Sequence, residues 1–284
     1  MPKDIHEANR LSWNAATVAH NSHKGDQAKF LRDGGSTLFQ EEIELLGDID
    51  GKTLLHLQCN SGQDTLSLAR LGAKVTGIDI SDEAIVFAQQ LSKESRIPGT
   101  FIRADVYDWF DSVGELGDKV DLVFCSYGAI CWLSDLQRWA EGISDLLVPG
   151  GRFVAIDFHP TLMMFDEEMR LTYPYFCDNN PMKWDEGVSD YVAMAEGALS
   201  PSGHEEGLQN FENPHPVFEY QWPIATILTS LLNAGLRLVR FTEYPYSNGA
   251  KFFDNGIEAS GRRMYPPKAQ PSIPMMYGIV AAKP

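Results

Sequence analysis

The sequence has few cysteines, few basic residues and no long apolar run, and each shortage excludes a class of protein. Its four cysteines, at positions 59, 125, 131 and 177, include no Cys-x-x-Cys pair. Three of them fall in apolar segments, which favours buried, reduced thiols over disulfides. The seven histidines are scattered, with no His-x-x-x-His pair, so no metal site is predicted.

Signals for export and for membrane insertion are also missing. Residues 1–10 lack the apolar stretch of a signal peptide, and 18 consecutive apolar residues occur nowhere in the sequence. We therefore expect a cytoplasmic protein that makes no membrane contact.

Positive charge is in the minority, with 23 Lys and Arg against 39 Asp and Glu and a formal net charge of −16. Such a chain repels phosphate backbones, so we expect no nucleic-acid partner. The length of 284 residues and the 44% hydrophobic content are enough for one large α/β domain. We expect a monomer or homodimer that acts on a small molecule.

What is present is a β-α-β pattern in TLLHLQCNSGQDTLSLARLG, residues 53–72, followed by AKVTGIDIS, residues 73–81. Gly62, in the turn, allows a ligand to approach the backbone closely, and the first turn of the helix that follows attracts an anion. Asp79 ends the second strand, where an acid can accept hydrogen bonds from both ribose hydroxyls. The pattern predicts a nucleotide site.

Four segments resemble, in order, the successive motifs of the class I S-adenosylmethionine (SAM) dependent methyltransferases, in particular the bacterial small-molecule type. They are VTGIDIS (75–81), FIRADVYDW (101–109), VDLVFCSYGAICWL (120–133) and LLVPGGRFVAIDFH (146–159). The resemblance covers residues 50–160 and, more loosely, 224–284. It implies a Rossmann-like, seven-stranded, mostly parallel sheet with helices on both faces. The last strand would run antiparallel between the fifth and the sixth. It also implies SAM as the methyl donor and S-adenosylhomocysteine (SAH) as the product.

The chain departs from the family pattern in the glycine loop. The acid-x-Gly-x-Gly-x-Gly positions of the family hold His56, Gln58, Asn60 and Gly62 here. The methionine part of SAM then requires either a different backbone path or side-chain donors from Gln58 and Asn60. The alternative is a doubly wound domain that binds no SAM.

The resemblance assigns most cofactor contacts to residues that follow strands. An acid at the position of Asp105 binds the adenine amino group, the N–H of the next residue is available to a ring nitrogen, and the fourth strand ends beside the methionine portion. Similar enzymes close an N-terminal helix over the cofactor with an aromatic residue and an asparagine, here Trp13 and Asn14, although Trp13 is equally explained by packing. The predicted cofactor-binding set is Trp13, Gln58, Asn60, Gly62, Asp79, Ile80, Asp105, Val106 and Ser126.

Residues 158–222 interrupt the α/β alternation with eleven aromatic residues. Between residues 159 and 220, twelve acids face only two bases. An insertion after the fifth strand lies above the strand ends, so we predict a substrate lid. Aromatic rings and carboxylates together suit an amine, through cation–π contacts of about 0.5–2 kcal/mol each. The alternative is that the rings pack on one another and the acids face water.

We therefore predict one domain spanning residues 1–284. It comprises an N-terminal cap (1–36), a SAM-binding core (37–157), the lid (158–222) and a C-terminal helix and strand pair (223–284). In the core, the spacing from Trp132 to Leu147 predicts one helix whose tryptophans pack inward. The long connection before the last strand can approach the substrate mouth.

The predicted reaction is direct displacement of a methyl group onto nitrogen, oxygen or sulfur, which depends mainly on alignment and exclusion of water. An acceptor that must lose a proton needs a base within about 3 Å. His159, after the fifth strand, is the predicted base, and Tyr127 is predicted to line the transfer channel. Both residues also have purely structural interpretations.

Two other classes of function stay open at this point. An NAD(P)-dependent oxidoreductase shares the strand, the turn and the ribose-binding acid, although the missing Gly-x-Gly-x-x-Gly and the acid at Asp105 count against it. A non-catalytic SAM-binding protein is compatible with the altered glycine loop.

Overall fold

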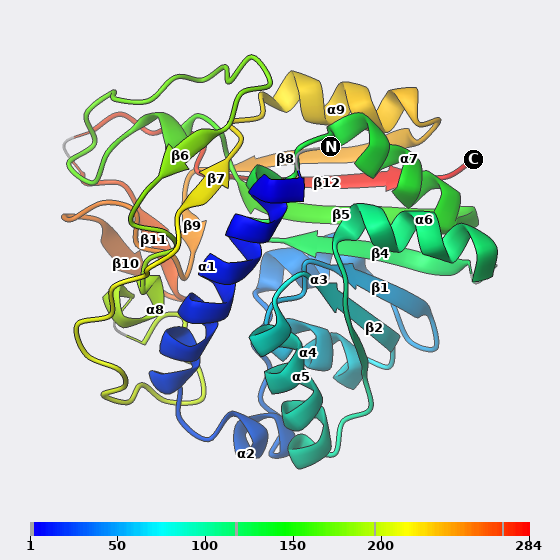
Figure 1. Cartoon of the computed structure of the whole chain (residues 1–284), viewed down its shortest axis with the longest axis horizontal. Helices are drawn as coiled ribbons and strands as arrows, with labels where there is room; N and C mark the ends of the chain where they lie inside the picture. The colour runs from blue at the N-terminus through cyan, green and yellow to red at the C-terminus, as the bar shows by residue number, and fades with distance from the viewer. Residues whose placement is uncertain (1–2, 117–118, 196, 269) are drawn as a thin grey trace.

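The short apolar runs of the sequence form the strands of a seven-stranded sheet (Figure 1). The computed structural model describes residues 3–116, 119–195, 197–268 and 270–284. The sheet has the order β3-β2-β1-β4-β5-β12-β8. Its strands are β1 (Thr53–Leu57), β2 (Lys74–Asp79), β3 (Thr100–Arg103), β4 (Val120–Ser126), β5 (Leu147–Phe158), β8 (Arg237–Tyr244) and β12 (Met276–Ala282). Only β12 pairs antiparallel, with β5 and β8, so the predicted sheet is confirmed.

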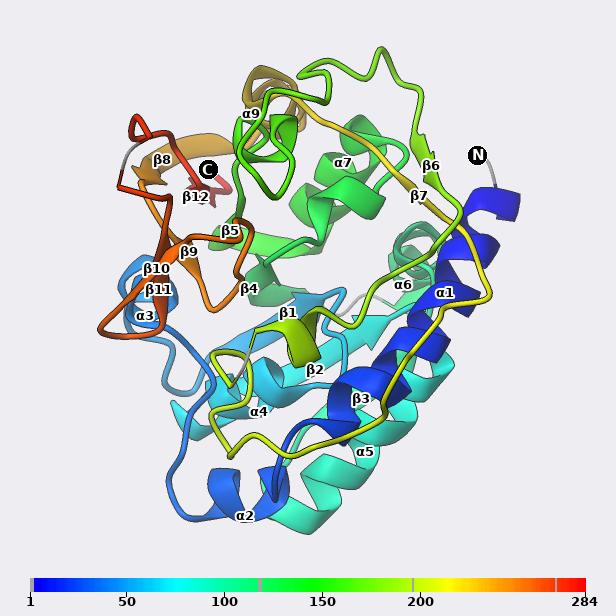
Figure 2. The ribbon, with the colours of Figure 1, turned by 90° about the vertical axis from the view of Figure 1, so that its left-hand side faces the viewer.

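Helices cover both faces of the sheet, as Figures 1 and 2 show. One face carries α3 (Gln40–Leu46), α4 (Gln63–Arg70) and α5 (Asp82–Ser95), and the other carries α6 (Val106–Leu116), α7 (Leu136–Leu146) and α9 (Ile224–Asn233). Successive side chains of a strand point to opposite faces. Leu54 of β1 accordingly packs with Leu46 and Leu68 on one side, and Leu55 belongs with Trp139 on the other. Apolar residues in succession therefore suit this strand.

The region after β4 differs from the prediction of one helix from Trp132 onward. Trp132 ends a short 3-10 helix, η1 (Ile130–Trp132), and α7 begins only at Leu136. The physical reason is an N-cap, because the Asp135 carboxylate accepts a hydrogen bond from the Arg138 N–H at 3.0 Å. Trp139 is fully buried, as predicted, whereas Trp132 lies outside the helix and faces a cavity.

Three parts of the chain gather at the carboxyl edge of the parallel strands (Figures 1 and 2). The first is α1 (Lys3–Ser22), which leads into α2 (Gln27–Arg32). The second is the lid segment, residues 158–222, with η2 (Leu162–Met164), β6 (Met182–Trp184), α8 (Tyr191–Met194) and β7 (Val217–Glu219). The third is the connection from β8 to β12, with β9 (Ser247–Asn248), β10 (Ile257–Ala259) and β11 (Arg263–Tyr265).

The helices are too short or too polar to cross a bilayer, as far as the chain is described.

Candidate active site

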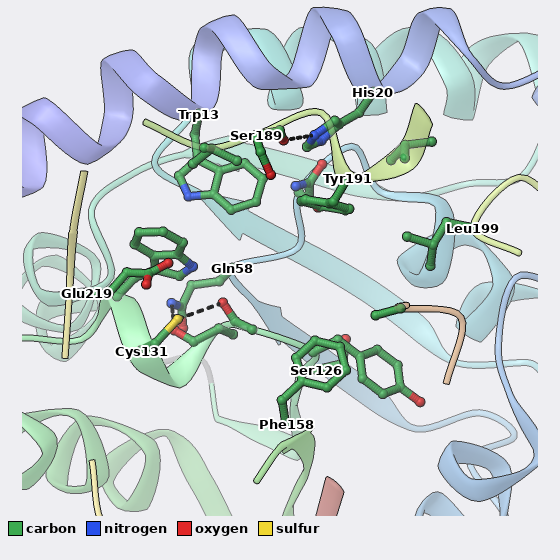
Figure 3. A pocket seen from close by; sticks show the side chains of 18 of the residues that line it. Trp13, His20, Gln58, Ser126, Cys131, Phe158, Ser189, Tyr191, Leu199 and Glu219 are labelled. Carbon is green, nitrogen blue, oxygen red and sulfur yellow. Dashed lines mark hydrogen bonds between the residues drawn. The ribbon is translucent and has the colours of Figure 1, made fainter. Parts of the chain in front are cut away.

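A cavity of about 1080 Å³ lies at the carboxyl edge of the sheet, with α1 across it (Figure 3). Its wall includes residues of α1, of the turns that follow β1, β2, β3 and β4, of the lid segment, and of the connection from β8 to β12. This last contribution agrees with the expectation that the long connection approaches the substrate mouth.

The turn after β1 has the backbone angles that usually favour glycine. Gln58 and Asn60 have φ values of 53° and 47°, in the left-handed region, which costs most residues about 1–2 kcal/mol. Local hydrogen bonds hold this conformation. The Gln58 amide donates to the Ala129 carbonyl at 2.6 Å, and the Asn60 side chain accepts from the Ser61 N–H at 2.6 Å. Both Gln58 and Asn60 line the cavity, as predicted.

Gly62 has a different role from the predicted one, because it does not line the cavity. It begins α4 with φ of 75°, and a Cβ added there would lie 2.7 Å from atoms of both Ala88 and Phe101. The absence of a side chain lets α4 pack closely against α5 and β3. We predicted that Gly62 lets a ligand approach the backbone, whereas in the structure it lets two helices and a strand pack closely.

Asp79 and Ile80 line the cavity at the end of β2. The Asp79 carboxylate accepts hydrogen bonds from the N–H groups of Asn60 and Ser81, each at 2.8 Å. Burial raises its pKa, and these backbone donors partly oppose that shift. The Ile80 N–H is a third backbone donor near this carboxylate, which offers about four lone pairs and so keeps some acceptor capacity for a ligand.

Asp105 and Val106 meet the same cavity at the start of α6. Asp105 lies 2.6 Å from His6 Nδ1 of α1 and accepts a hydrogen bond from the Tyr107 N–H at 2.9 Å. Burial alone would raise the pKa of Asp105, but the hydrogen bond and charge of His6, with the backbone donors, hold it below its usual range. The other ring nitrogen of His6 lies 2.8 Å from the Ser134 hydroxyl.

The end of β4 places Ser126 and Tyr127 in the wall. Tyr127 has φ of 32° and accepts a hydrogen bond on its phenol oxygen from the Asn248 amide at 2.9 Å. Burial raises the pKa of Tyr127 well above its usual value, so the phenol stays neutral. The turn that follows is fixed by Asp157, whose carboxylate accepts hydrogen bonds from the N–H groups of Gly128 and Ile130.

His56 occupies the position of the family's acid and carries no charge at neutral pH. Its Nδ1 lies 2.8 Å from the Thr65 hydroxyl, and its Nε2 lies 3.5 Å from the Ser126 hydroxyl. Burial lowers the pKa of His56 to about 3. The cavity floor is therefore neutral at the position where the family has a carboxylate.

His159, the predicted base, does not line the cavity. Its Nε2 pairs with Glu243 of β8 at 3.1 Å, and its Nδ1 accepts a hydrogen bond from the Thr161 N–H at 3.0 Å. Both ring nitrogens are thus engaged away from the cavity. The structure favours the structural interpretation of His159.

Of the two residues predicted to close over the cofactor from the N-terminal helix, one lines the cavity and the other does not. Trp13 lines the cavity, with its ring edge-on to Trp132 at 5.6 Å between centroids. Asn14 does not line it, because its side chain accepts from the Ser81 hydroxyl at 2.7 Å and donates to Asp82 at 3.1 Å. Asn14 fastens α1 to the start of α5.

The cavity residues that the sequence analysis did not assign to the site include His6, Lys24, Gln63, Trp132 and Glu219. Burial lowers the pKa of Lys24 to about 8, against the opposing charge of Asp64. Trp132 could have been predicted as a cavity residue, because it lies at the end of a segment that resembles a family motif. Glu219 had none, since it is one of twelve acids in its segment.

Comparisons with known proteins find similarity to methyltransferases. Residues 55–153 match the family model described as "Methyltransferase domain". YqeM of Bacillus subtilis, which its name assigns provisionally to the methyltransferases, is 25% identical over 213 residues, or 75% of this chain and 81% of YqeM. A ubiquinone biosynthesis O-methyltransferase of a Methylobacterium species is 29% identical over 115 residues, or 40% of this chain and 44% of that protein.

Residues 55–153 of the chain therefore match a methyltransferase domain. The resemblance to that family, and the expectation of an enzyme of that type, are confirmed by the family match together with the sheet order. The oxidoreductase alternative is dropped.

Solved structures show the same fold for this methyltransferase. A structure described as a SAM-dependent methyltransferase of Mesorhizobium loti aligns with a TM-score of 0.52 and 18% identity, covering 89% of this chain and all of that one. The chain spans less than half of the ubiquinone-pathway relative, so the acceptor cannot be transferred from that match.

Proposed function

We propose that this methyltransferase transfers a methyl group from SAM to a nitrogen, oxygen or sulfur atom of a small-molecule acceptor. The observation that carries the proposal is the convergence of Asp79, Asp105 and the left-handed turn at Gln58 and Asn60 on one cavity. Its volume, about 1080 Å³, is slightly above the range of about 300–1,000 Å³ that is usual for ligand pockets, which leaves room for donor and acceptor together.

The residues present fit the chemistry of SAM. The free lone pairs of Asp79 suit the two ribose hydroxyls. Asp105 and the Val106 N–H, at the first residue of α6, offer an acceptor and a donor to the adenine edge. Gln58, Asn60 and Ser126 receive the methionine portion, and Lys24 is a cation for its carboxylate. Trp13 covers the site from α1.

When bound, SAM supplies a methyl group activated by the adjacent sulfonium. The chain contributes orientation and a dry cavity, because α1, the lid and the β8–β12 connection close over the strand ends. Tyr127 supplies a neutral phenol wall. In this proposal residues 1–36 are the cap, 37–157 the SAM-binding core, 158–222 the substrate lid and 223–284 the closing helix and strand pair, within one domain. We further expect a monomer or homodimer without a nucleic-acid partner.

Calorimetric titration with SAM and SAH tests the proposal. Asp79→Asn removes the charge that accepts the ribose hydroxyls, and we expect SAH affinity to fall at least about tenfold, or about 1.4 kcal/mol. The matched control is Asp121→Asn, because Asp121 also accepts a backbone N–H, that of Thr53 at 2.9 Å, but does not line the cavity. Failure of the wild-type protein to bind either compound would overturn the proposal. Binding without turnover on any acceptor would instead support the non-catalytic alternative.

A further inference from the structure

One group of cavity residues is not needed to hold the methyl donor: Trp132, Trp184, Tyr173 and Glu219. We propose that these residues, with Trp13 beside them, form the acceptor subsite, and that it selects a cationic amine whose ammonium group pairs with the Glu219 carboxylate. The inference rests on the proposed function, since it names the substrate class of the same cavity.

The register of the β6–β7 ribbon directs these side chains to the cavity. Met182 pairs with Glu219 and Trp184 with Val217, so these four share one face of the two-stranded ribbon. All four line the cavity, whereas Lys183 and Phe218 of the intervening pair do not. Lys183 forms an ion pair with Asp185 instead. The ribbon thus presents a carboxylate to the cavity and keeps its own cation outside.

Glu219 is a desolvated carboxylate with no basic partner in the part of the chain that the structure describes. Burial raises the pKa of Glu219, and the only opposing influence is the neighbouring Trp184 indole. Its charge reaches the Cys131 thiol on the cavity wall, where it helps to raise the pKa of that group. Figure 3 shows Glu219 beside Cys131 in the cavity. A carboxylate that is partly removed from water and has no cation beside it is unfavourable, so this position favours a ligand that brings one.

Aromatic rings from three separate segments line the same cavity as the Glu219 carboxylate. The rings of Trp13 and Trp132 meet edge-on at 5.6 Å, and those of Tyr173 and Trp184 at 5.4 Å. Ring faces attract ammonium groups, Trp most strongly, and the attraction grows when water is excluded. Arg262, another cation of the cavity wall, is engaged elsewhere, stacked on Phe39 and donating to the Ala198 and Thr37 carbonyls.

The test measures how tightly three probes of similar size bind to the protein saturated with SAH. Calorimetry and tryptophan fluorescence detect the binding. Benzylamine is a cation at neutral pH, benzyltrimethylammonium is a permanent cation, and benzyl alcohol is neutral. We expect both cations to bind at least about tenfold more tightly than the alcohol. This comparison needs no variant. Equal binding of the alcohol and the cations would overturn the inference.

The matched variants are Glu219→Gln and Glu212→Gln. Glu212 belongs to the same segment but is exposed and does not line the cavity. Glu219→Gln is expected to remove the preference for cations and leave SAH affinity unchanged, whereas Glu212→Gln keeps both. If Glu219→Gln weakens SAM relative to SAH and leaves the amines unaffected, the carboxylate faces the sulfonium and the acceptor assignment is wrong.

The two proposals fail separately. If SAH does not bind but the cations bind in a manner that depends on Glu219, the proposed function fails and the cation site stands. If SAH binds and the cations show no preference, only the acceptor assignment fails.

Discussion

At the scale of single residues, His56 shows how burial sets chemistry in this site. Its side chain is 2% exposed and its pKa is lowered to about 3, while an unfolded histidine titrates near 6.5. The folded state therefore excludes a proton that the unfolded state binds. The stability contributed by neutral His56 is complete above about pH 6.5 and is lost as pH falls toward 3, at about 1.4 kcal/mol per pH unit.

This predicts a pH-dependent effect of His56→Gln. The variant should be less stable than the wild type at about pH 8, because it loses the bond to Thr65, and the gap should narrow by about 2 kcal/mol at about pH 5. Urea unfolding at both pH values measures the two gaps. His204→Gln, at an exposed histidine, is the control. If the stability difference between His56→Gln and the wild type is the same at both pH values, His56 binds protons equally in the folded and unfolded states.

Residues that follow directly from strand ends could be predicted from the sequence, and those placed by tertiary contacts could not. Asp79 and Asp105 each follow a parallel strand, and all such ends meet at one edge of the sheet. His159 also follows a strand, yet its ring turns toward Glu243, a partner 84 positions later in the chain. Glu219 reaches the cavity only through its pairing with Met182, which no local pattern reveals.

At the scale of elements, the packing of α4 depends on Gly62. This glycine lies where α4 meets Ala88 of α5 and Phe101 of β3. The apolar spacing of each element was visible in the sequence, which is why their presence could be predicted. The distance at which α4 packs against α5 and β3 could not be predicted, because it depends on the left-handed conformation of Gly62 between them.

Gly62→Ala should destabilise the fold by about 3 kcal/mol, from left-handed strain and overpacking together. The matched control is Gly150→Ala, since Gly150 has a similar φ of 78° but nothing within 4 Å of an added Cβ. Strain alone predicts a loss of about 1 kcal/mol there. Urea unfolding compares the two, and equal losses would show that the contacts with Ala88 and Phe101 relax without cost.

At the scale of the whole molecule, α1 connects the floor of the cavity to the lid. On one side His6 meets Asp105 and Asn21 donates to the Ser61 hydroxyl at 2.8 Å. On the other side Asn9 exchanges two hydrogen bonds with the Phe218 backbone, at 3.0 and 2.8 Å. The lid contacts the core through this helix and also directly, through Tyr220 and Trp222. We expect a cofactor bound beneath α1 to stabilise both α1 and the lid.

Hydrogen exchange with and without SAH tests this coupling. A ligand present at about 100 times its Kd stabilises the closed state by about 2.7 kcal/mol, so amides of α1 and β7 that exchange through opening of the site should slow about 100-fold. Slowing confined to residues 57–80 would show instead that the cap and lid move independently of the cofactor.

Asn9→Ala separates the two sides of α1. It removes both bonds to Phe218 and leaves His6 and Asn21 in place, so SAH should still slow exchange in α1 but no longer in β7. Asn180→Ala is the control, because Asn180 is an exposed lid residue whose side chain donates to the nearby Asp178 carbonyl. If SAH still slows exchange of the β7 amides in Asn9→Ala, the lid is held by the ligand in the cavity and not by the bonds from Asn9. That result is expected if the acceptor site at Glu219 is part of the same occupied cavity.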